Sequence, residues 1–252
     1  MSAIRIYRQT LRTFTERAGF LLLLGILVFV PLGLIDALAN HVETIHVSRV
    51  SDLTDLATAA LAVGFVLQAT TSLLGEVFYS GAVALTLARA RHGHEPTLGE
   101  ISRSLSYGRL IAVDILFGLA VAVGLVLLVV PGIVLFTWFS LAGPLVEIED
   151  DGVKASFARS RRLVRGRFWA VLAVLGPITL ASEALTQVVL SLSHDAIASP
   201  FLRDWIGETL TNLALSPFYA VAAVLITLEL RDSAATGGRA RLANGPASRP
   251  ED

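Results

Sequence analysis

The chain has no cysteine among its 252 residues, which excludes disulfide bonds, a thiolate nucleophile and a cysteine-ligated metal site. It is also poor in charge. Asp, Glu, Lys and Arg make up 16% of the residues, hydrophobic residues make up 54%, and the mean hydropathy is +0.68. A soluble domain of this length would need more polar surface. The composition therefore predicts an integral membrane protein, and the net charge of −1 gives no indication of a nucleic-acid partner.

Sequence motifs of common enzymes are also missing. There is no HExxH, no GxSxG, no phosphate-binding Gly-Lys loop and no dinucleotide fingerprint. His92 and His94 lie in a basic loop with no third ligand nearby, and two such histidines do not define a metal site. We therefore expect a protein that is not an enzyme and that has no cofactor and no bound metal.

Apolar stretches long enough to cross a bilayer, or nearly so, recur along the chain. The second is too long for a straight span, so it must tilt, break near Gly75 or project from the bilayer, and we expect it to protrude on the outer side. Pro131 and Gly132 fall between the third and fourth, where we expect a tight turn. The sequence thus predicts six spans, over residues 20–39, 56–87, 110–130, 133–148, 168–190 and 205–230.

The basic residues are segregated between alternate loops. Of the 20 Lys and Arg residues, only Arg49 and Arg203 lie on the side opposite to the rest. Lys and Arg accumulate in the cytoplasmic loops of membrane proteins. The expected location is the cell membrane, with several passes and with both the N-terminus and the C-terminus in the cytoplasm.

A basic amphipathic stretch precedes each predicted pair of spans, within residues 4–18, 98–105 and 153–168. Such stretches can lie as interfacial helices with apolar residues in the acyl boundary, or they can be irregular basic loops. We expect the helices. The predicted fold class is all-α: a polytopic transmembrane helical bundle of six spans, arranged as three hairpins that each follow a basic amphipathic helix. Its transmembrane domain covers residues 1–231, and residues 232–252 form a disordered cytoplasmic tail.

Carboxyl groups within the predicted spans are the clearest candidates for a site, because a lone carboxylate is costly in hydrocarbon. Helical rise from the inner boundary places Glu76 and Glu183 at a similar depth, so the two could face each other. Asp114 follows Arg109 by five residues and could reach the interface. Further polar residues form stripes on the same helix faces along the second, fifth and sixth predicted spans. They are Gln68, Ser72, Ser80, Thr179, Thr186, Gln187, Asn212, Ser216 and Thr227.

Two interpretations fit these polar stripes. In the functional one they line a cavity that binds a proton, a cation or a lipid headgroup. In the structural one they are interhelical hydrogen bonds between neutral carboxyls and neighbouring helices. The candidate intramembrane polar site consists of Glu76, Asp114, Glu183, Gln68 and Ser72.

The central passage resembles a bacterial and archaeal membrane family. It comprises Val130-Pro131-Gly132-Ile133, Trp138, Ala142, Pro144, Glu149, Gly152, Ala155, Arg159-Ser160, Leu163, Gly166 and Phe168-Trp169. The family includes the membrane domain of some glycerophosphodiester phosphodiesterases and related stand-alone, uncharacterised membrane proteins. The ending from Pro217-Phe218 to Leu228-Glu229-Leu230-Arg231 is similar to the family's closing span but lacks its tyrosine. The resemblance implies fold and topology only, because the catalytic barrel is absent here.

Three functions follow as hypotheses. The first is a protein that associates with lipids or assists a membrane protein partner, with anionic headgroups on the cytoplasmic side as its ligands. The second is a small transporter that uses Glu76 and Glu183. The third, intramembrane hydrolysis of a lipid ester, has the least support. The candidate contacts to anionic lipid are Arg159, Arg161, Arg162 and Arg165.

Overall fold

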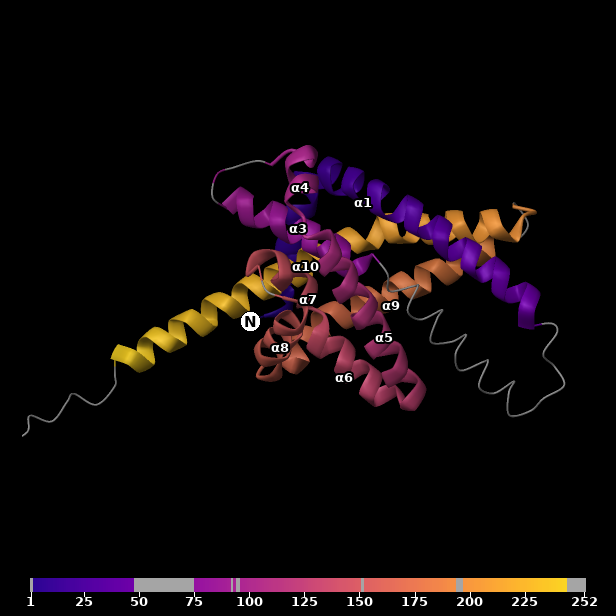
Figure 1. Ribbon diagram of the computed structural model, residues 1–252. Helices are drawn as coiled ribbons and strands as arrows, with labels where there is room; N and C mark the ends of the chain where they lie inside the picture. The colour runs from indigo at the N-terminus through magenta and orange to yellow at the C-terminus, as the bar shows by residue number, and fades with distance from the viewer. Residues whose placement is uncertain are drawn as a thin grey trace, which may run out of the picture.

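The structure is a computed structural model that describes residues 2–47, 75–91, 93, 96–150, 152–193 and 197–243, with the backbone alone at residues 36, 39–47 and 237–243. In this part of the chain every regular element is a helix (Figure 1). The helices are α1 (Ala3–Val47), α3 (Glu76–Arg91), α4 (Leu98–Ser104), α5 (Tyr107–Leu127), α6 (Val129–Phe139), α7 (Ala142–Ile148), α8 (Val153–Arg165), α9 (Phe168–Ser193) and α10 (Pro200–Ala243).

Five helical segments of the described chain are long and apolar enough to cross a membrane. Large apolar side chains on them are exposed, such as Leu27, Leu127 and Leu180, as expected where hydrocarbon replaces water as the solvent. The protein is therefore a membrane-embedded helical bundle. The segments are Ala3–Ile35, Tyr107–Leu127, Val129–Ile148, Phe168–Ser193 and Pro200–Thr236.

The second predicted span, residues 56–87, lies largely outside the described residues. Its last part is α3, which begins at Glu76 directly after Gly75, whose φ of +92° is a conformation that favours glycine. The backbone is therefore not helical at Gly75, and the expected protrusion of this span stays a prediction. The count of six spans and the arrangement in three hairpins stay predictions.

Basic segments at the ends of the spans are helical. In α1 the backbone departs from helical geometry at Arg17 (φ −127°, ψ 19°), which separates the basic first part from the apolar remainder. A capping box between Thr97 and Glu100 starts α4, because each residue satisfies a backbone N–H of the other. The three basic stretches are therefore largely helical, as expected, and are not irregular loops, which were the alternative.

The turn between α5 and α6 differs from the prediction. It lies at Leu128 (φ −170°, ψ 148°), and Pro131 and Gly132 are inside the first turn of α6, where a proline costs no helical hydrogen bond. A Cβ atom on Gly124 would lie 2.9 Å from the Cα of Gly132, so these glycines let the two helices approach closely. The segment that corresponds to the predicted fourth span is longer than predicted because α6 begins before residue 133. After a break at Ser140 and Leu141, α7 ends at residue 148, as predicted.

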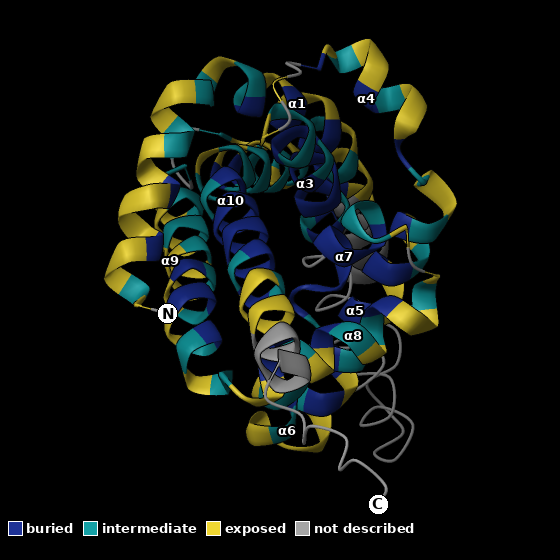
Figure 2. Cartoon of the chain, turned by 90° about the vertical axis from the view of Figure 1, so that its left-hand side faces the viewer, coloured by how far each residue is buried: buried dark blue, intermediate teal, exposed yellow. Residues whose placement is uncertain are grey.

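The centre of the bundle is formed by α3, α7 and α10. Figure 2 shows α3 and α7 mainly buried, whereas α4 and α9 carry many exposed residues. Gly143 of α7 lies against α3, where an added Cβ would be 2.5 Å from the carbonyl oxygen of Val77. Residues 220–224 of α10 are fully buried. Small residues thus allow the helices to pack backbone to backbone.

The last helix, α10, packs most extensively against α1. The rings of Phe14 and Phe218 stack with centroids 4.4 Å apart, and Arg5 pairs with Glu229. Beyond residue 231 the structure differs from the expected disordered tail, because α10 continues to Ala243 and extends away from the bundle (Figure 1). Alanine, leucine and arginine in this segment favour a helix despite two glycines. Residues 244–252 lie outside the described residues.

Candidate intramembrane polar site and basic face

Asp114 lies on α5 and is 3% exposed. Its Oδ2 atom accepts a hydrogen bond of 2.6 Å from the backbone N–H of Gly75, and its Oδ1 atom accepts one of 3.3 Å from that of Val77. Backbone N–H groups at the start of a helix have no partner within the helix, and a carboxylate there also interacts favourably with the helix dipole. Asp114 therefore caps α3 from a neighbouring helix in the interior of the protein, and it does not reach out to the interface.

Glu76 is the first residue of α3. Its Oε1 atom accepts a hydrogen bond of 2.6 Å from the hydroxyl of Ser216 on α10. The residue is partly exposed as a whole, but its Oε2 atom is buried and makes no hydrogen bond within the described part of the chain. Half of the carboxyl group is thus satisfied by α10, and half lacks a partner.

Tyr219 lies almost one turn after Ser216 on the same helix and is 4% exposed. Its hydroxyl has no hydrogen-bond partner among the described residues, and it lies within electrostatic range of both Glu76 and Asp114. The hydroxyl of Tyr79, by contrast, donates a bond of 2.7 Å to the carbonyl of Leu21. We call Glu76, Asp114, Ser216 and Tyr219 the carboxyl cluster.

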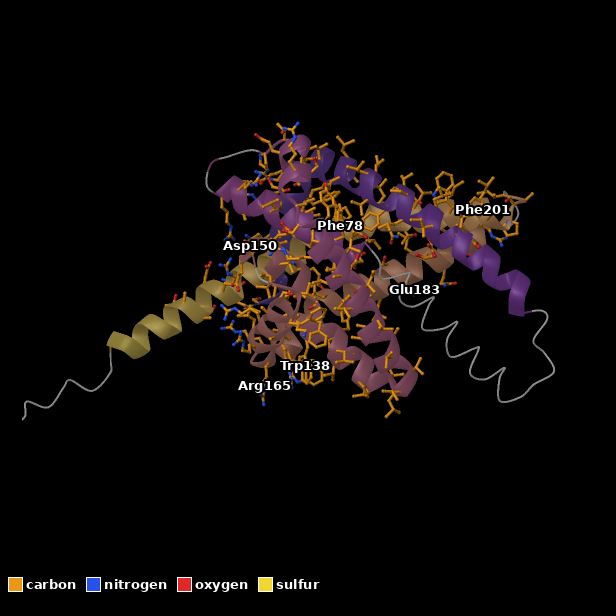
Figure 3. All side chains as sticks on the ribbon, in the orientation of Figure 1. Phe78, Trp138, Asp150, Arg165, Glu183 and Phe201 are labelled. Carbon is orange, nitrogen blue, oxygen red and sulfur yellow. The ribbon has the colours of Figure 1, made fainter. Side chains whose placement is uncertain are left out.

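The structure brings together only part of the predicted polar site. Glu183 is exposed on α9, where Gln187 donates a bond of 3.0 Å to its Oε1 atom, and Figure 3 shows it on the half of α9 nearer Phe201. Glu76 instead accepts a hydrogen bond from Ser216 and lies within electrostatic range of Asp114. Gln68 and Ser72 lie outside the described residues. Ser216 belonged to the predicted stripe on the sixth span, but Tyr219 did not, and its three-residue spacing from Ser216 was the available signal.

At the other candidate site, α8 is held against the bundle by three polar contacts. Arg159 pairs with Glu149 at 3.2 Å, the hydroxyl of Ser160 donates a bond of 2.6 Å to the carbonyl of Trp138, and Arg161 lies 4.5 Å above the Trp138 ring. Two of the four arginines predicted to contact lipid are thus engaged with the protein.

Arg162 and Arg165 are exposed, and the described residues give them no ion-pair partner. Figure 3 shows Arg165 extending away from the helices. Trp169, in the first turn of α9, is 78% exposed. We call Arg162, Arg165 and Trp169 the basic face. It combines two cations with an aromatic ring of the type that prefers the headgroup level of a membrane.

Glu149 bridges two helices, because it also pairs with Arg231 of α10 at 2.8 Å, and its own side chain is 16% exposed. Glu149→Gln should remove the charge shared by both arginines and lower the free energy of unfolding by about 1–3 kcal/mol, since the pairs are only partly buried. Unfolding in a fixed detergent would measure this. Glu16→Gln removes an exposed pair with Arg12 and should have no measurable effect. Equal stability of both variants would contradict the bridging role.

The described residues also form a pocket at one end of α3. It has a volume of about 670 Å³ and lies where α1, α3 and α10 meet. Within the described residues, no group of three or more His, Asp or Glu is placed to hold a metal ion. His92 and His94 lie outside these residues. The pocket is lined by Arg5, Gln9, Arg91, Leu225, Glu229, Asp232, Ser233 and Thr236.

No family model matches the chain, and no solved structure matches it. The resemblance of the passage around Pro131-Gly132 to the phosphodiesterase-associated membrane family therefore stays a prediction. The function has to be argued from the carboxyl cluster and the basic face.

Proposed function

We propose that this protein is a non-enzymatic component of the cell membrane that binds anionic lipid headgroups at its cytoplasmic side through the basic face. The observation that carries the proposal is the exposure of Arg162 and Arg165, which are followed closely in sequence by the exposed Trp169. The proposed topology, with both termini in the cytoplasm, follows from the segregation of Lys and Arg.

The fixed position of α8 supports this function. Arg159, Ser160 and Arg161 all contact α6 or the residue that follows α7. The helix therefore cannot rotate freely about its axis, and Arg162 and Arg165 are held toward the surroundings. A pre-oriented pair of cations loses less conformational entropy on binding a phosphate than two mobile side chains would.

The neighbouring helix supplies an anchor at a suitable depth. Trp169 comes at the start of α9, only four residues after Arg165. Tryptophan prefers the membrane–water interface, and phosphate groups of lipids lie at the same level. An arginine pair and an interfacial tryptophan in this order match the headgroup region of an anionic leaflet.

Quenching of Trp169 fluorescence tests the proposal. The protein is placed in nanodiscs that contain phosphatidylglycerol or phosphatidylcholine, brominated near the top of the acyl chains, and the Trp169→Phe variant gives the background. Each arginine near an anionic surface contributes about 1 kcal/mol. Replacing both Arg162 and Arg165 by Gln should therefore lower the preference for phosphatidylglycerol by roughly 10- to 30-fold at constant ionic strength.

The control is Arg203→Gln, which removes one positive charge from the first turns of α10, where Arg203 lies near Asp204. It should leave the preference unchanged, whereas Arg162→Gln and Arg165→Gln should each lower it. An unchanged preference in the double variant, with circular dichroism showing intact helices, would refute lipid binding at this face.

A further inference from the structure

The carboxyl cluster contains two buried polar atoms without a partner in the described residues, the Oε2 atom of Glu76 and the hydroxyl of Tyr219. Buried polar atoms are almost always hydrogen-bonded, directly or through a ligand or water, because an unpaired one costs free energy. The cost is greatest in a bilayer, where no bulk water can compensate. Two such atoms within electrostatic range of each other call for a common explanation.

We infer that Glu76, Ser216 and Tyr219, together with the charge of Asp114, form a binding site for one monovalent cation, H⁺ or Na⁺, inside the helical bundle. The available donors are all oxygens: the two carboxyl groups and the hydroxyls of Ser216 and Tyr219. Oxygen ligands suit hard cations. The inference is independent of the proposed binding of lipid at the basic face.

The two carboxyls are not equivalent. Asp114 accepts N–H bonds from Gly75 and Val77 at the positive end of α3, so its negative charge is compensated within the protein. Glu76 has one bond from a neutral hydroxyl and an uncompensated Oε2 atom. A cation on Glu76 would neutralise the carboxylate whose charge is stabilised by fewer hydrogen bonds.

The surroundings of Glu76 limit the charge of the ligand. Among the described residues, the titratable groups that face it are Asp114 from α5, Tyr79 from its own helix and Tyr219 from α10. With Asp114 engaged as a cap, one free carboxylate remains to balance a ligand. A single positive charge therefore neutralises Glu76, while the N-terminus of α3 stabilises the charge of Asp114. Proton and sodium ion share this chemistry and differ in the number of oxygen ligands that they need.

The competing interpretation is a packing contact in which the Tyr219 hydroxyl is an unpaired group with no ligand. The two interpretations predict opposite effects for Tyr219→Phe. If the hydroxyl is only an unpaired buried group, its removal is neutral or stabilising at every cation concentration. If it is a ligand, its removal weakens cation binding.

The experiment measures the apparent Tm of the full chain in detergent while NaCl is titrated against choline chloride at constant ionic strength, and repeats the titration from pH 5 to pH 9. A ligand that binds only the folded state stabilises it by RT ln(1 + L/Kd), where L is the free ligand concentration, so the Tm rises with the logarithm of that concentration once it exceeds Kd. The expected result is such a rise with Na⁺, or a rise as the pH falls, which identifies the proton as the cation.

In either case Glu76→Gln should abolish the response and Tyr219→Phe should weaken the apparent affinity by about 10- to 100-fold, as loss of one supporting contact does at metal sites. Tyr79→Phe is the matched control: its hydroxyl bonds to Leu21, so its loss should lower the Tm equally under all conditions. A Tm that depends on neither Na⁺ nor pH in the wild type, or a response that survives in Tyr219→Phe at full affinity, overturns the inference. Tyr219→Phe keeps the test decisive if Glu76→Gln does not fold.

Discussion

Gly143→Ala is expected to destabilise the protein by about 3 kcal/mol, because the new methyl group would meet backbone and not a side chain that can move away. An ideal Cβ at this position lies 2.5 Å from the carbonyl oxygen of Val77 and 2.8 Å from the hydroxyl oxygen of Ser80. The helices α3 and α7 would have to separate at the centre of the bundle. Since Tyr79 and Ala82 of α3 are fully buried there, the separation would open the core.

The comparison with Gly108→Ala isolates this effect. Gly108 lies in the first turn of α5, and an added Cβ there meets nothing within 4 Å. Alanine favours a helix over glycine by about 1 kcal/mol, so Gly108→Ala should be neutral or slightly stabilising. Unfolding of both variants in the same detergent measures the difference. If Gly143→Ala unfolded like Gly108→Ala, the close contact between α3 and α7 would not exist in the protein.

Asp114→Ala is expected to cost about 2–4 kcal/mol, because it removes the acceptor for the N–H groups of Gly75 and Val77 at once. No residue of α3 precedes Glu76 to satisfy these groups. The start of α3 should fray, and Glu76, its first residue, should lose its fixed position opposite Ser216. Equilibrium unfolding measures the loss of stability, and amide exchange by mass spectrometry over residues 75–80 measures the fraying.

Asp114→Asn provides the matched comparison. The amide keeps the size of the carboxyl group and one acceptor oxygen but directs an NH₂ group at the second N–H, so about half of the loss is expected. Equal stability of Asp114→Ala and the wild type would show that α3 does not depend on this cap. Amide exchange over residues 75–80 distinguishes a loss of the cap, which exposes the start of α3, from a loss of cation binding alone, which does not.

Much of the fold follows from hydropathy and charge. The departure from helical geometry at Arg17 falls close to residue 20, where the predicted first span begins, because the chain passes there from a basic surface helix into an apolar one. The position of the turn at Leu128 is harder to predict from the sequence. Pro131 and Gly132 are typical turn residues, so the sequence places the turn at them. Proline is equally compatible with the first turn of a helix, and only the packing of Gly124 on Gly132 decides between the two.

The candidate site was predicted only in part, and for a geometric reason. Counting residues from the membrane boundary gives the depth of Glu76 along its helix but neither the rotation of that helix nor its neighbours. Glu183 has a similar predicted depth but lies on an exposed face of α9, whereas Asp114 meets the start of α3 from α5. Tyr219 was missed because an aromatic residue in an apolar run is expected to be packing, and its unpaired hydroxyl is visible only in three dimensions.

The pairing of α1 with α10 has a consequence for biosynthesis. Phe14 stacks on Phe218, and Arg5 pairs with Glu229. Glu149 can form its ion pair with Arg231 only after α10 has been made. The ribosome makes α1 before α10, so α1 resides in the membrane without its main partner while the intervening helices are inserted. Until then α1 is available to chaperones or quality-control proteases of the membrane. The later helix α10 thus completes the contacts of the earlier helix α1.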